Sequence, residues 1–460
     1  MAEQGRFLTG STMGHVARMT LAGAMGITFV FLVDAANLFW VSQLGAPKLV
    51  AAIGFAFAIQ FFSVSSGIGL MIAAIALIAR GIGKGDREQA RRHATSSAAI
   101  AFVIQTLMAG IVIYFRHDIL AMVGATGETA ALAARYLAVS LPSLGIMAIS
   151  MIANGALRAE GAAKRSMFVT LISGMVSMVL DPFLIYQWGL DGAAMGLNIS
   201  RFVMLVVALR FAVGTHDLMA RLRLADVIET LRPFLIIAVP AIMAQMAMPV
   251  GNYLLTSVMA PYGDDAMAGW AVVGRLTVVA FGGIFSLSGA IGGIFGQNYG
   301  AGNYERLRTT YRDAIIFGLA YSLVTWIVLA SASSLVISAF DLSPLGGDIV
   351  ASFTTVGAGA FLMASALFVS NSAFNALGRP SWATLTNWLR DGVISLPLAI
   401  LLAGWYGATG VIYAQAVASV IVGALAGWLG WRYVVGLGRF DPDLEIDRRP
   451  HTNADRFRRR

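Results

Sequence analysis

Long stretches without a single charged residue are the feature that most limits how this chain can fold. Leu49 to Ala79 is one of them, and several others of similar length follow. A helix rises 1.5 Å per residue, so about 20 residues cross the ~30 Å hydrocarbon layer of a bilayer. Lipid leaves backbone groups unpaired unless the segment is a helix or part of a closed barrel. The short alternating segments of a barrel are absent, so the sequence predicts an all-α integral membrane protein.

The composition supports this prediction. Apolar residues make up 58% of the chain and charged residues 12%, and the mean hydropathy is +0.76. The formal charge of +8 lies mostly in loops and in the C-terminal tail, whereas a nucleic-acid binder needs a basic folded face. We therefore expect the lipid bilayer, and no nucleic acid, as a partner. Cysteine is absent, so no disulfide or thiolate metal site can form.

The apolar runs predict twelve transmembrane helices. Their expected ranges are 18–43, 49–79, 94–115, 132–157, 166–187, 192–214, 233–260, 266–296, 313–340, 349–376, 382–403 and 408–434. The first of these is too long for a cleavable leader and is expected to stay.

The charges of the connecting loops predict the orientation. The even-numbered connections hold sixteen cations, whereas the odd-numbered ones hold three, Lys48, Arg116 and Arg135. Cytoplasmic loops of membrane proteins carry the excess of Lys and Arg. We therefore expect a multi-pass protein of the cytoplasmic (inner) membrane with both termini in the cytoplasm.

The two halves of the chain repeat each other. The segment that begins at Arg80 and contains Gly83 and Gly85 returns 217 positions later at Gln297, with Gly300 and Gly302. Other glycines and prolines match at offsets of 215 to 218: Gly45 with Gly263, Gly161 with Gly378, Pro182 with Pro397, and Gly192 with Gly410. Chance similarity between apolar helices would not align glycines and prolines at one nearly constant offset. Since six helices return the chain to its starting side, the repeats are predicted to be parallel.

This duplication predicts the domain organisation. We expect a six-helix lobe at 1–214, a cytoplasmic linker at 215–232, a second six-helix lobe at 233–436 and a charged, disordered tail at 437–460.

Several motifs resemble those of the multidrug and toxic compound extrusion (MATE) transporters. They are Leu157 to Gly161 with Lys164 and Arg165, Leu180-Asp181-Pro182, Gly189 to Ala194, and Gly296 to Asn303. The resemblance spans about residues 15–436 and is greatest to the branch typified by the DNA-damage-inducible protein F. It implies a V-shaped pair of lobes that alternate in access and export organic cations or amphiphilic drugs, without a cofactor, in exchange for H⁺ or Na⁺. We expect a monomer.

Two acidic residues lie inside apolar segments. An ionisable side chain at the bilayer centre costs about 2.5–3.5 kcal/mol on insertion scales and tends to be functional. Asp34 in the first segment shares a helix face with Asn37, and Asp181 in the fifth precedes Pro182, which removes a backbone donor. We predict that the two acids couple transport to ion entry. The alternatives are a packing role for Asp34 and simple hydration of Asp181 near a helix end.

Other residues are expected to support this site. The acid on helix five of the family is usually preceded by Asn four residues earlier, and Ser177 stands there instead, which favours H⁺ over Na⁺. Asn154 and Thr170 are further candidates. The second half lacks matching acids, because Asp34 aligns with Asn252 and Asp181 with Leu396. Its cavity candidates are therefore neutral: Gln245, Asn252, Asn371 and Asn375.

Three arginines in apolar segments, Arg201, Arg275 and Arg390, are predicted to be buried and structural. Adjacent helical residues diverge, so Arg390 and Asp391 are expected to pair with other groups. If the three arginines converged, they could instead bind pyrophosphate in a flippase for a lipid-linked precursor, which is the alternative function. An enzyme is not expected, because the histidines fall outside the apolar segments in no metal-ligand spacing.

Overall fold

The computed structural model describes residues 5–44 and 47–438, and these residues form helices joined by short loops, without a strand. The first half contains α1 (Thr12–Ser42), α2 (Pro47–Gly83), α3 (Arg87–Tyr114), α4 (Arg116–Met122), α5 (Gly127–Ser140), α6 (Leu144–Glu160) and α7 (Ala163–Ala212). The second half contains α8 (Leu224–Met259), α9 (Asp264–Gly300), α10 (Tyr304–Ser331), α11 (Ser333–Ala339), α12 (Pro344–Ser352), α13 (Phe361–Leu377), α14 (Pro380–Trp388), α15 (Ser395–Tyr406) and α16 (Thr409–Gly436).

The predicted twelve spans are confirmed when the bent pair α12 and α13 is counted as one span and α7 as two. Within the described residues, ten helices are long and apolar enough to cross a membrane, and the bent pair α12 and α13 makes an eleventh span. The twelfth lies inside α7, whose 50 residues contain a break at Gly189 (φ 56°, ψ −127°). This backbone conformation suits glycine, so one residue turns the chain between two spans.

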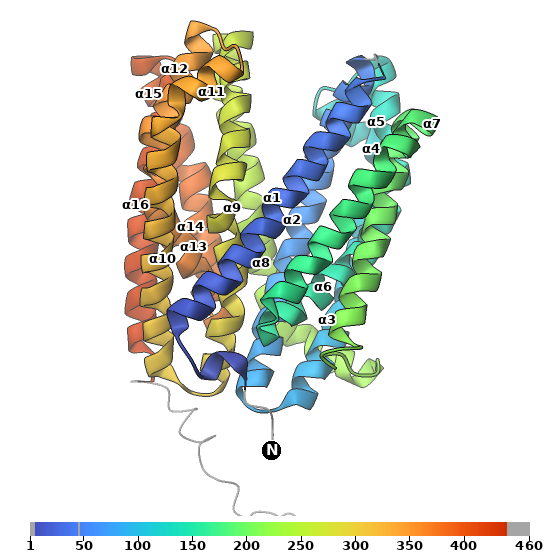
Figure 1. Cartoon of the computed structure of the whole chain (residues 1–460), viewed down its shortest axis with the longest axis vertical. Coiled ribbons are helices and arrows are strands. Elements are labelled where there is room, and N and C mark those ends of the chain that lie inside the picture. Colours follow the sequence, from blue (N-terminus) through green and yellow to red (C-terminus); the bar gives the residue numbers. More distant parts are fainter. Residues whose placement is uncertain (1–4, 45–46, 439–460) are drawn as a thin grey trace, which may run out of the picture.

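The two halves form two bundles, as Figure 1 shows. Helices α1 to α7 make the first bundle and α8 to α16 the second. α1 begins and α16 ends at the same end of the molecule, which we call the basal end, and the bundles diverge away from it. α1 runs diagonally from the basal part of the second bundle, where the Thr12 hydroxyl donates a hydrogen bond to Asp313 of α10.

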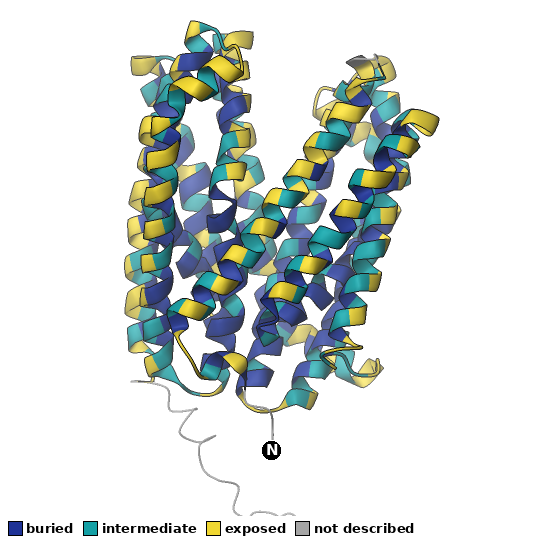
Figure 2. Ribbon diagram, in the orientation of Figure 1, coloured by how far each residue is buried: buried dark blue, intermediate teal, exposed yellow. Residues whose placement is uncertain are grey.

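The basal end holds the bundles together. Figure 2 shows buried residues filling both bundles and this junction, with exposed residues on the outer faces and at the opposite end. The Gln297 amide donates to the carbonyl oxygen of Ala159 at 2.7 Å, and the Arg80 guanidinium donates to that of Ala376 at 2.9 and 2.7 Å. All three bonds join one bundle to the other.

The repeated glycines pack symmetrically at this junction. A Cβ on Gly83 would lie 2.0 Å from the carbonyl oxygen of Gln297, and one on Gly300 would lie 2.2 Å from that of Arg80. Gly83 and Gly300 are equivalent in the repeat, and so are Arg80 and Gln297. Each glycine therefore makes the same contact with the other repeat. Only glycine allows this approach of two backbones. The match is the one expected of parallel repeats related by a two-fold axis.

Other aligned glycines also have matching conformations. Gly161 (φ 94°, ψ 17°) and Gly378 (φ 97°, ψ 17°) end α6 and α13 in the left-handed region. Gly189 is matched by Gly407 (φ 64°, ψ −147°), which ends α15. Gly45 and the tail beyond Gly438 lie outside the described residues.

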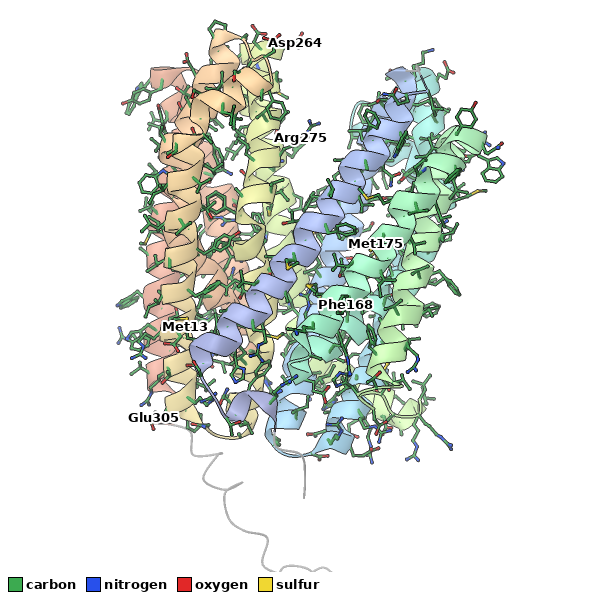
Figure 3. The ribbon with its side chains drawn as sticks, viewed as in Figure 1. Met13, Phe168, Met175, Asp264, Arg275 and Glu305 are labelled. Atoms are coloured by element: carbon green, nitrogen blue, oxygen red, sulfur yellow. The ribbon has the colours of Figure 1, made fainter. Side chains whose placement is uncertain are left out.

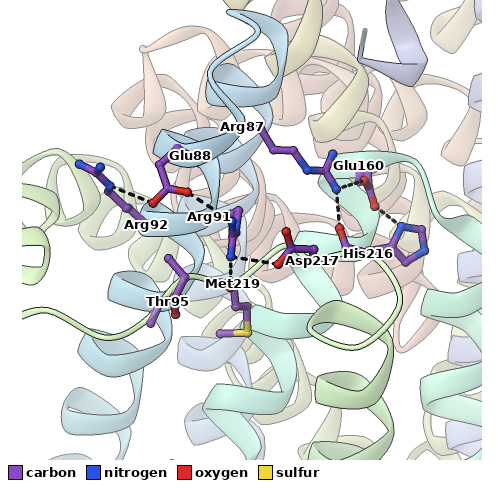
Figure 4. Close-up of polar contacts among 10 residues, drawn as sticks. Arg87, Glu88, Arg91, Arg92, Thr95, Glu160, His216, Asp217 and Met219 are labelled. Atoms are coloured by element: carbon purple, nitrogen blue, oxygen red, sulfur yellow. Dashed lines mark hydrogen bonds and ion pairs between the residues drawn. The ribbon is translucent and has the colours of Figure 1, made fainter. Parts of the chain in front are cut away.

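The connection between the bundles is fastened to the first bundle (Figure 4). Arg91 of α3 pairs with Asp217 at 2.9 Å, and the Thr95 hydroxyl donates to the carbonyl oxygen of Ala220 at 3.0 Å. His216 pairs with Glu160 at the end of α6. α8 begins at Leu224, inside the segment expected to be a linker, so the attached stretch 216–220 is followed by only three residues before this helix.

Candidate functional site

The two intramembrane acids predicted from the sequence lie near each other in the first bundle. Asp34 is on the half of α1 remote from the basal end, and Asp181 is on the first half of α7. The two carboxylates act on each other electrostatically. Asp181 is buried, with 2% of its surface exposed, whereas Asp34 is exposed. The pair therefore has one accessible and one inaccessible member.

The carboxylate of Asp181 has hydrogen-bonding neighbours on two helices, Ser177 of α7 and Asn37 of α1. The Ser177 hydroxyl, one turn earlier, donates a hydrogen bond to Oδ2. On the other side the carboxylate presses against Gly196 in the second half of α7, where a Cβ would lie 2.0 Å from Oδ1. Oδ1 is buried without a hydrogen-bond partner among the described residues. A buried carboxylate oxygen with an open acceptor position can take up a proton or a cation.

Asn37 and Pro182 complete the surroundings of this pair. Asn37 lies close enough to Asp181 to act on its charge, and its own Oδ1 is buried without a partner. Pro182 interrupts the ladder inside α7, because proline has no N–H to donate and its ring crowds the preceding turn. The sequence predicted both residues as support for the site, and the structure places both beside Asp181.

Two members of this cluster were not predicted as site residues. Tyr136 of α5 interacts electrostatically with Asp34, Asp181 and Arg201. Arg201, on the second half of α7, donates from Nη1 to the carbonyl oxygen of Ser140 at 2.8 Å and to Ser143 Oγ at 2.7 Å. Tyr136 stands in a run of ordinary helix-forming residues, so no local signal in the sequence distinguishes it.

The weaker candidates of the first half, Asn154 and Thr170, lie elsewhere in the first bundle. Asn154 of α6 is buried, and its Oδ1 has no partner among the described residues. Thr170 of α7 faces α1, where a Cβ on Gly26 would lie 3.7 Å from the threonine Cβ. Neither side chain makes a hydrogen bond with Asp34 or Asp181 in the described part of the chain.

The neutral candidates of the second bundle are not gathered in one place. Asn371 of α13 is buried and accepts a hydrogen bond from Thr386 Oγ1 at 3.2 Å. Gln245 is partly exposed and Asn252 is exposed on α8. Asn375 lies nearer the basal end, where it and Ser372 help to line a cavity of about 10 Å³ between α2, α9 and α13.

The expectation that three arginines are buried is wrong for Arg275. This side chain on α9 is exposed, and Figure 3 shows it pointing away from its own bundle toward the first. The apolar neighbours of Arg275 suggested burial in a packed interior. They line a face where the bundles have diverged, so the side chain is left uncovered.

The expectation that Arg390 and Asp391 pair with other groups is also wrong. Arg390 Nε lies 2.7 Å from Asp391 Oδ1, and Nη2 lies 3.0 Å from Oδ2. The two residues sit in a π-helical turn, Leu389–Ile394. A π-turn is wider than an α-turn, so successive side chains diverge less and the long arginine can fold back onto its neighbour. Arg201, Arg275 and Arg390 therefore do not converge on a common anion site.

Comparisons with known proteins agree with this architecture. A family model described as MatE matches residues 23–183 and 240–401, one stretch in each bundle. The chain is 24% identical over 436 residues to a FAD transporter of Shewanella oneidensis, covering 92% of this chain and 96% of that protein. It is 26% identical over 412 residues to the multidrug export protein MepA of Staphylococcus aureus, covering 85% and 87%.

Solved structures share the fold. The outward-facing conformation of a multidrug resistance MATE family transporter superposes with a TM-score of 0.88 at 22% identity, over 95% of this chain and 99% of that one. A MATE structure in complex with MaL6 gives a TM-score of 0.88 at 22% identity, over 95% and 100%. These structures support the two-lobed arrangement of twelve helices.

Proposed function

The chain belongs to the MATE family of membrane transporters, and we propose that it exports organic cations or amphiphilic compounds in exchange for H⁺. This membership confirms the expectation of a transporter rather than an enzyme. The observation that carries the proposal is the pair of acids, Asp34 exposed and Asp181 buried, within the apolar spans of the first bundle. The similarity of the chain to a multidrug export protein supports organic cations and amphiphilic compounds as its substrates.

The pair suits exchange because a proton and an organic cation compete for the same carboxylates. Two negative charges that repel each other, one of them buried, favour uptake of one positive charge. A cation bound at Asp34 supplies that charge. A proton that binds Asp34 neutralises the carboxylate and so weakens its attraction for the cation. Asp181 Oδ1, which no described residue hydrogen-bonds, provides a second place for the proton. Entry of H⁺ and release of cargo then become linked events.

We propose H⁺ rather than Na⁺ because the oxygens around Asp181 are few. Ser177 supplies a hydroxyl that already donates to the carboxylate, and Asn37 supplies an amide. Sodium ions need several converging oxygens, whereas a proton needs one.

We further propose that both termini lie in the cytoplasm, that the membrane is the cytoplasmic one, and that the protein acts as a monomer. The excess of cations in the basal loops supports this orientation. The basal end is the closed end, so the state described here opens to the outside, where protons reach Asp34.

Transport in proteoliposomes tests the proposal. Purified protein is reconstituted and the export of a fluorescent organic cation is followed after a pH gradient is imposed. We expect the wild-type protein to drive export and Asp34→Asn to abolish it while the folded yield is kept. Asp264→Asn, an exposed acid at the far end of α9 (Figure 3), is the matched control. Wild-type export by Asp34→Asn would falsify the coupling role of this residue.

The similarity to a FAD transporter over 92% of the chain favours FAD as a second candidate cargo. Competition of FAD with the fluorescent cation in the same proteoliposomes tests it, and no competition at millimolar FAD would exclude it.

A further inference from the structure

A small cavity with two unpartnered oxygens lies where the bundles meet. It is lined by α2, α9 and α13, and its volume of about 10 Å³ is close to the space that one water molecule needs. Ser372 Oγ and Asn375 Oδ1 belong to two of its lining residues, and both atoms are buried without a hydrogen-bond partner among the described residues. A water molecule that bonds to these oxygens fits this space. The cavity is therefore a hydration point just inside the closed basal end.

Arg80 of α2 stands next to this cavity. Its guanidinium donates to the carbonyl oxygen of Ala376, and Ala376 lines the cavity. The guanidinium also lies over the ring of Tyr299, 5.3 Å from the centroid. In the part of the chain that the structure describes, no carboxylate lies within ion-pair distance of Arg80. Its positive charge is thus held by a carbonyl group and an aromatic ring, neither of which neutralises it.

Arg158 approaches the same cavity from α6 of the first bundle. A Cβ on Gly289, another lining residue, would lie 3.2 Å from Arg158 Nη1. The only hydrogen bond that the Arg158 side chain makes with a described residue runs from Nε to Ser166 Oγ at 3.1 Å. Among the described residues no carboxylate lies within ion-pair distance of Arg158 either. Two cations without counter-charges therefore flank a space that fits one water molecule.

We propose that Arg80 and Arg158 form an electrostatic barrier that keeps protons from leaking through the closed basal end. The bundles diverge at the opposite end, and a membrane potential that is negative inside pulls cations from there toward the base. A water molecule in the cavity offers a relay step to a proton at this point. Two positive charges beside it make a protonated state of this water costly, as an arginine does in water pores that exclude protons.

This inference rests on the proposed orientation and coupling to H⁺, and it adds a function that the coupling acids do not supply. Exchange uses the proton gradient only if protons cross with the transport cycle. A leak past the base would consume the gradient without moving cargo. The first bundle therefore takes up protons at Asp34, and the junction denies them a direct route onward.

Proton entry into proteoliposomes without cargo tests the barrier. A pH-sensitive dye is trapped inside, and a potassium diffusion potential, negative inside, is imposed with valinomycin. The initial rate of internal acidification is compared between variants at equal amounts of folded full-length protein. Each arginine variant is made both in the wild-type chain and together with Asp34→Asn. A leak past the base does not need Asp34, whereas proton entry through uncoupled transport cycles does.

We expect the wild-type rate to stay close to that of protein-free liposomes. Arg80→Gln and Arg158→Gln should each raise it about tenfold, with or without Asp34→Asn, because each removes one of two charges beside the cavity. Arg158→Lys keeps the charge and should keep the low rate. Arg275→Gln, which removes an exposed arginine of α9, is the matched control and should keep it too. Asn375→Leu, which removes an oxygen of the cavity, should return the leak of Arg158→Gln toward the wild-type rate.

A wild-type rate in folded Arg80→Gln and Arg158→Gln overturns the inference. An equal leak in Arg158→Lys and Arg158→Gln also overturns it, because a packing defect would then be the cause. The same holds if Asn375→Leu leaves the leak undiminished, since the protons would then take another route. If one glutamine variant does not fold, the other decides.

The proposed export function fails separately from this barrier. A rise that disappears in Asp34→Asn would come from transport cycles, which contradicts the barrier and leaves the coupling role of Asp34 in place. Wild-type protein that exports no cation but leaks only when Arg80 or Arg158 is replaced would contradict the export function alone.

Discussion

The two bundles share a backbone plan but differ in their polar interiors. Gly83 and Gly300 pack reciprocally, and Gly161 and Gly378 end equivalent helices in the same conformation. In the first bundle, however, Asp181 retains an unpartnered oxygen, whereas in the second bundle Asp391 is bonded twice to Arg390. The buried acid of the second bundle is thus paired with an arginine, whereas the buried acid of the first keeps an open acceptor.

This difference shows which positions a duplicated membrane protein can vary. A glycine whose Cβ would enter the backbone of the other repeat cannot change without moving a helix. A polar side chain inside a bundle can change freely if its partners change too. The repeats have therefore kept the junction and the turns and have diverged at the sites where chemistry is possible.

The largest expected effect is a loss of stability when the ion pair between Arg390 and Asp391 in the second bundle is broken. Asp391→Asn leaves Arg390 buried without its counter-charge, which should lower the free energy of unfolding by about 3–5 kcal/mol. Thermal unfolding in detergent measures this effect. Asp34→Asn should unfold at the wild-type temperature, because Asp34 has no bonded counter-charge. Equal destabilisation by the two substitutions would remove the distinction between the bundles.

The junction glycines should respond symmetrically to substitution. Gly83→Ala and Gly300→Ala each place a methyl group about 2 Å from a carbonyl oxygen of the other repeat, and overpacking of this kind costs about 1–3 kcal/mol. We expect both variants to open the basal end to a similar extent. Because the chain has no cysteine, a single Ser288→Cys reporter near the junction measures this opening by its rate of thiol labelling. A strong effect of only one glycine would contradict the two-fold packing.

Gly196 should matter for transport more than for stability. Its Cβ would meet a carboxylate oxygen of Asp181 at 2.0 Å, and this side chain can rotate away. Gly196→Ala should therefore lower proton-driven export about tenfold, an effect of ~1.4 kcal/mol, with little change in unfolding temperature. Gly404→Ala in α15, where a Cβ meets open space, is the control and should stabilise slightly. Unaltered export by Gly196→Ala would show that the position of Asp181 is unimportant.

The smallest effect is expected where an acid is added to the second bundle. Asn252 occupies the position that matches Asp34 in the repeat, and it is exposed on α8. Asn252→Asp should change export less than about threefold and should not restore export to Asp34→Asn, because the neighbouring acid, Asp391, which packs against Gly251 of α8, is already bonded to Arg390. Restored export in the double variant would mean that an acid in either bundle can couple export to proton entry.

Much of the fold could be predicted from the sequence because the bilayer limits the choices. Apolar runs, loop cations and repeated glycines identified twelve spans and two parallel repeats. The turn at Gly189 separates two helices as predicted, and α7 carries one label across it because a single glycine turns the chain without a loop.

The site was less predictable, because contacts between helices depend on rotation and curvature that the sequence does not state. Asp34, Asn37 and Asp181 were named from their chemistry and Ser177 from the family resemblance, and the structure places Ser177 and Asn37 beside Asp181. Tyr136 was missed because nothing in its own segment sets it apart. Arg390 was misjudged because the rule that neighbouring side chains diverge applies to α-turns, and this turn is a π-turn.

The attachment of residues 216–220 to α3 and α6 affects how the bundles can move. These residues travel with the first bundle, so only the three positions between Ala220 and Leu224 can act as a joint. A joint this short permits rotation but little separation at the basal end. When one bundle rotates about this joint, its displacement is smallest at the basal end. The displacement is largest at the opposite end, near Asp34.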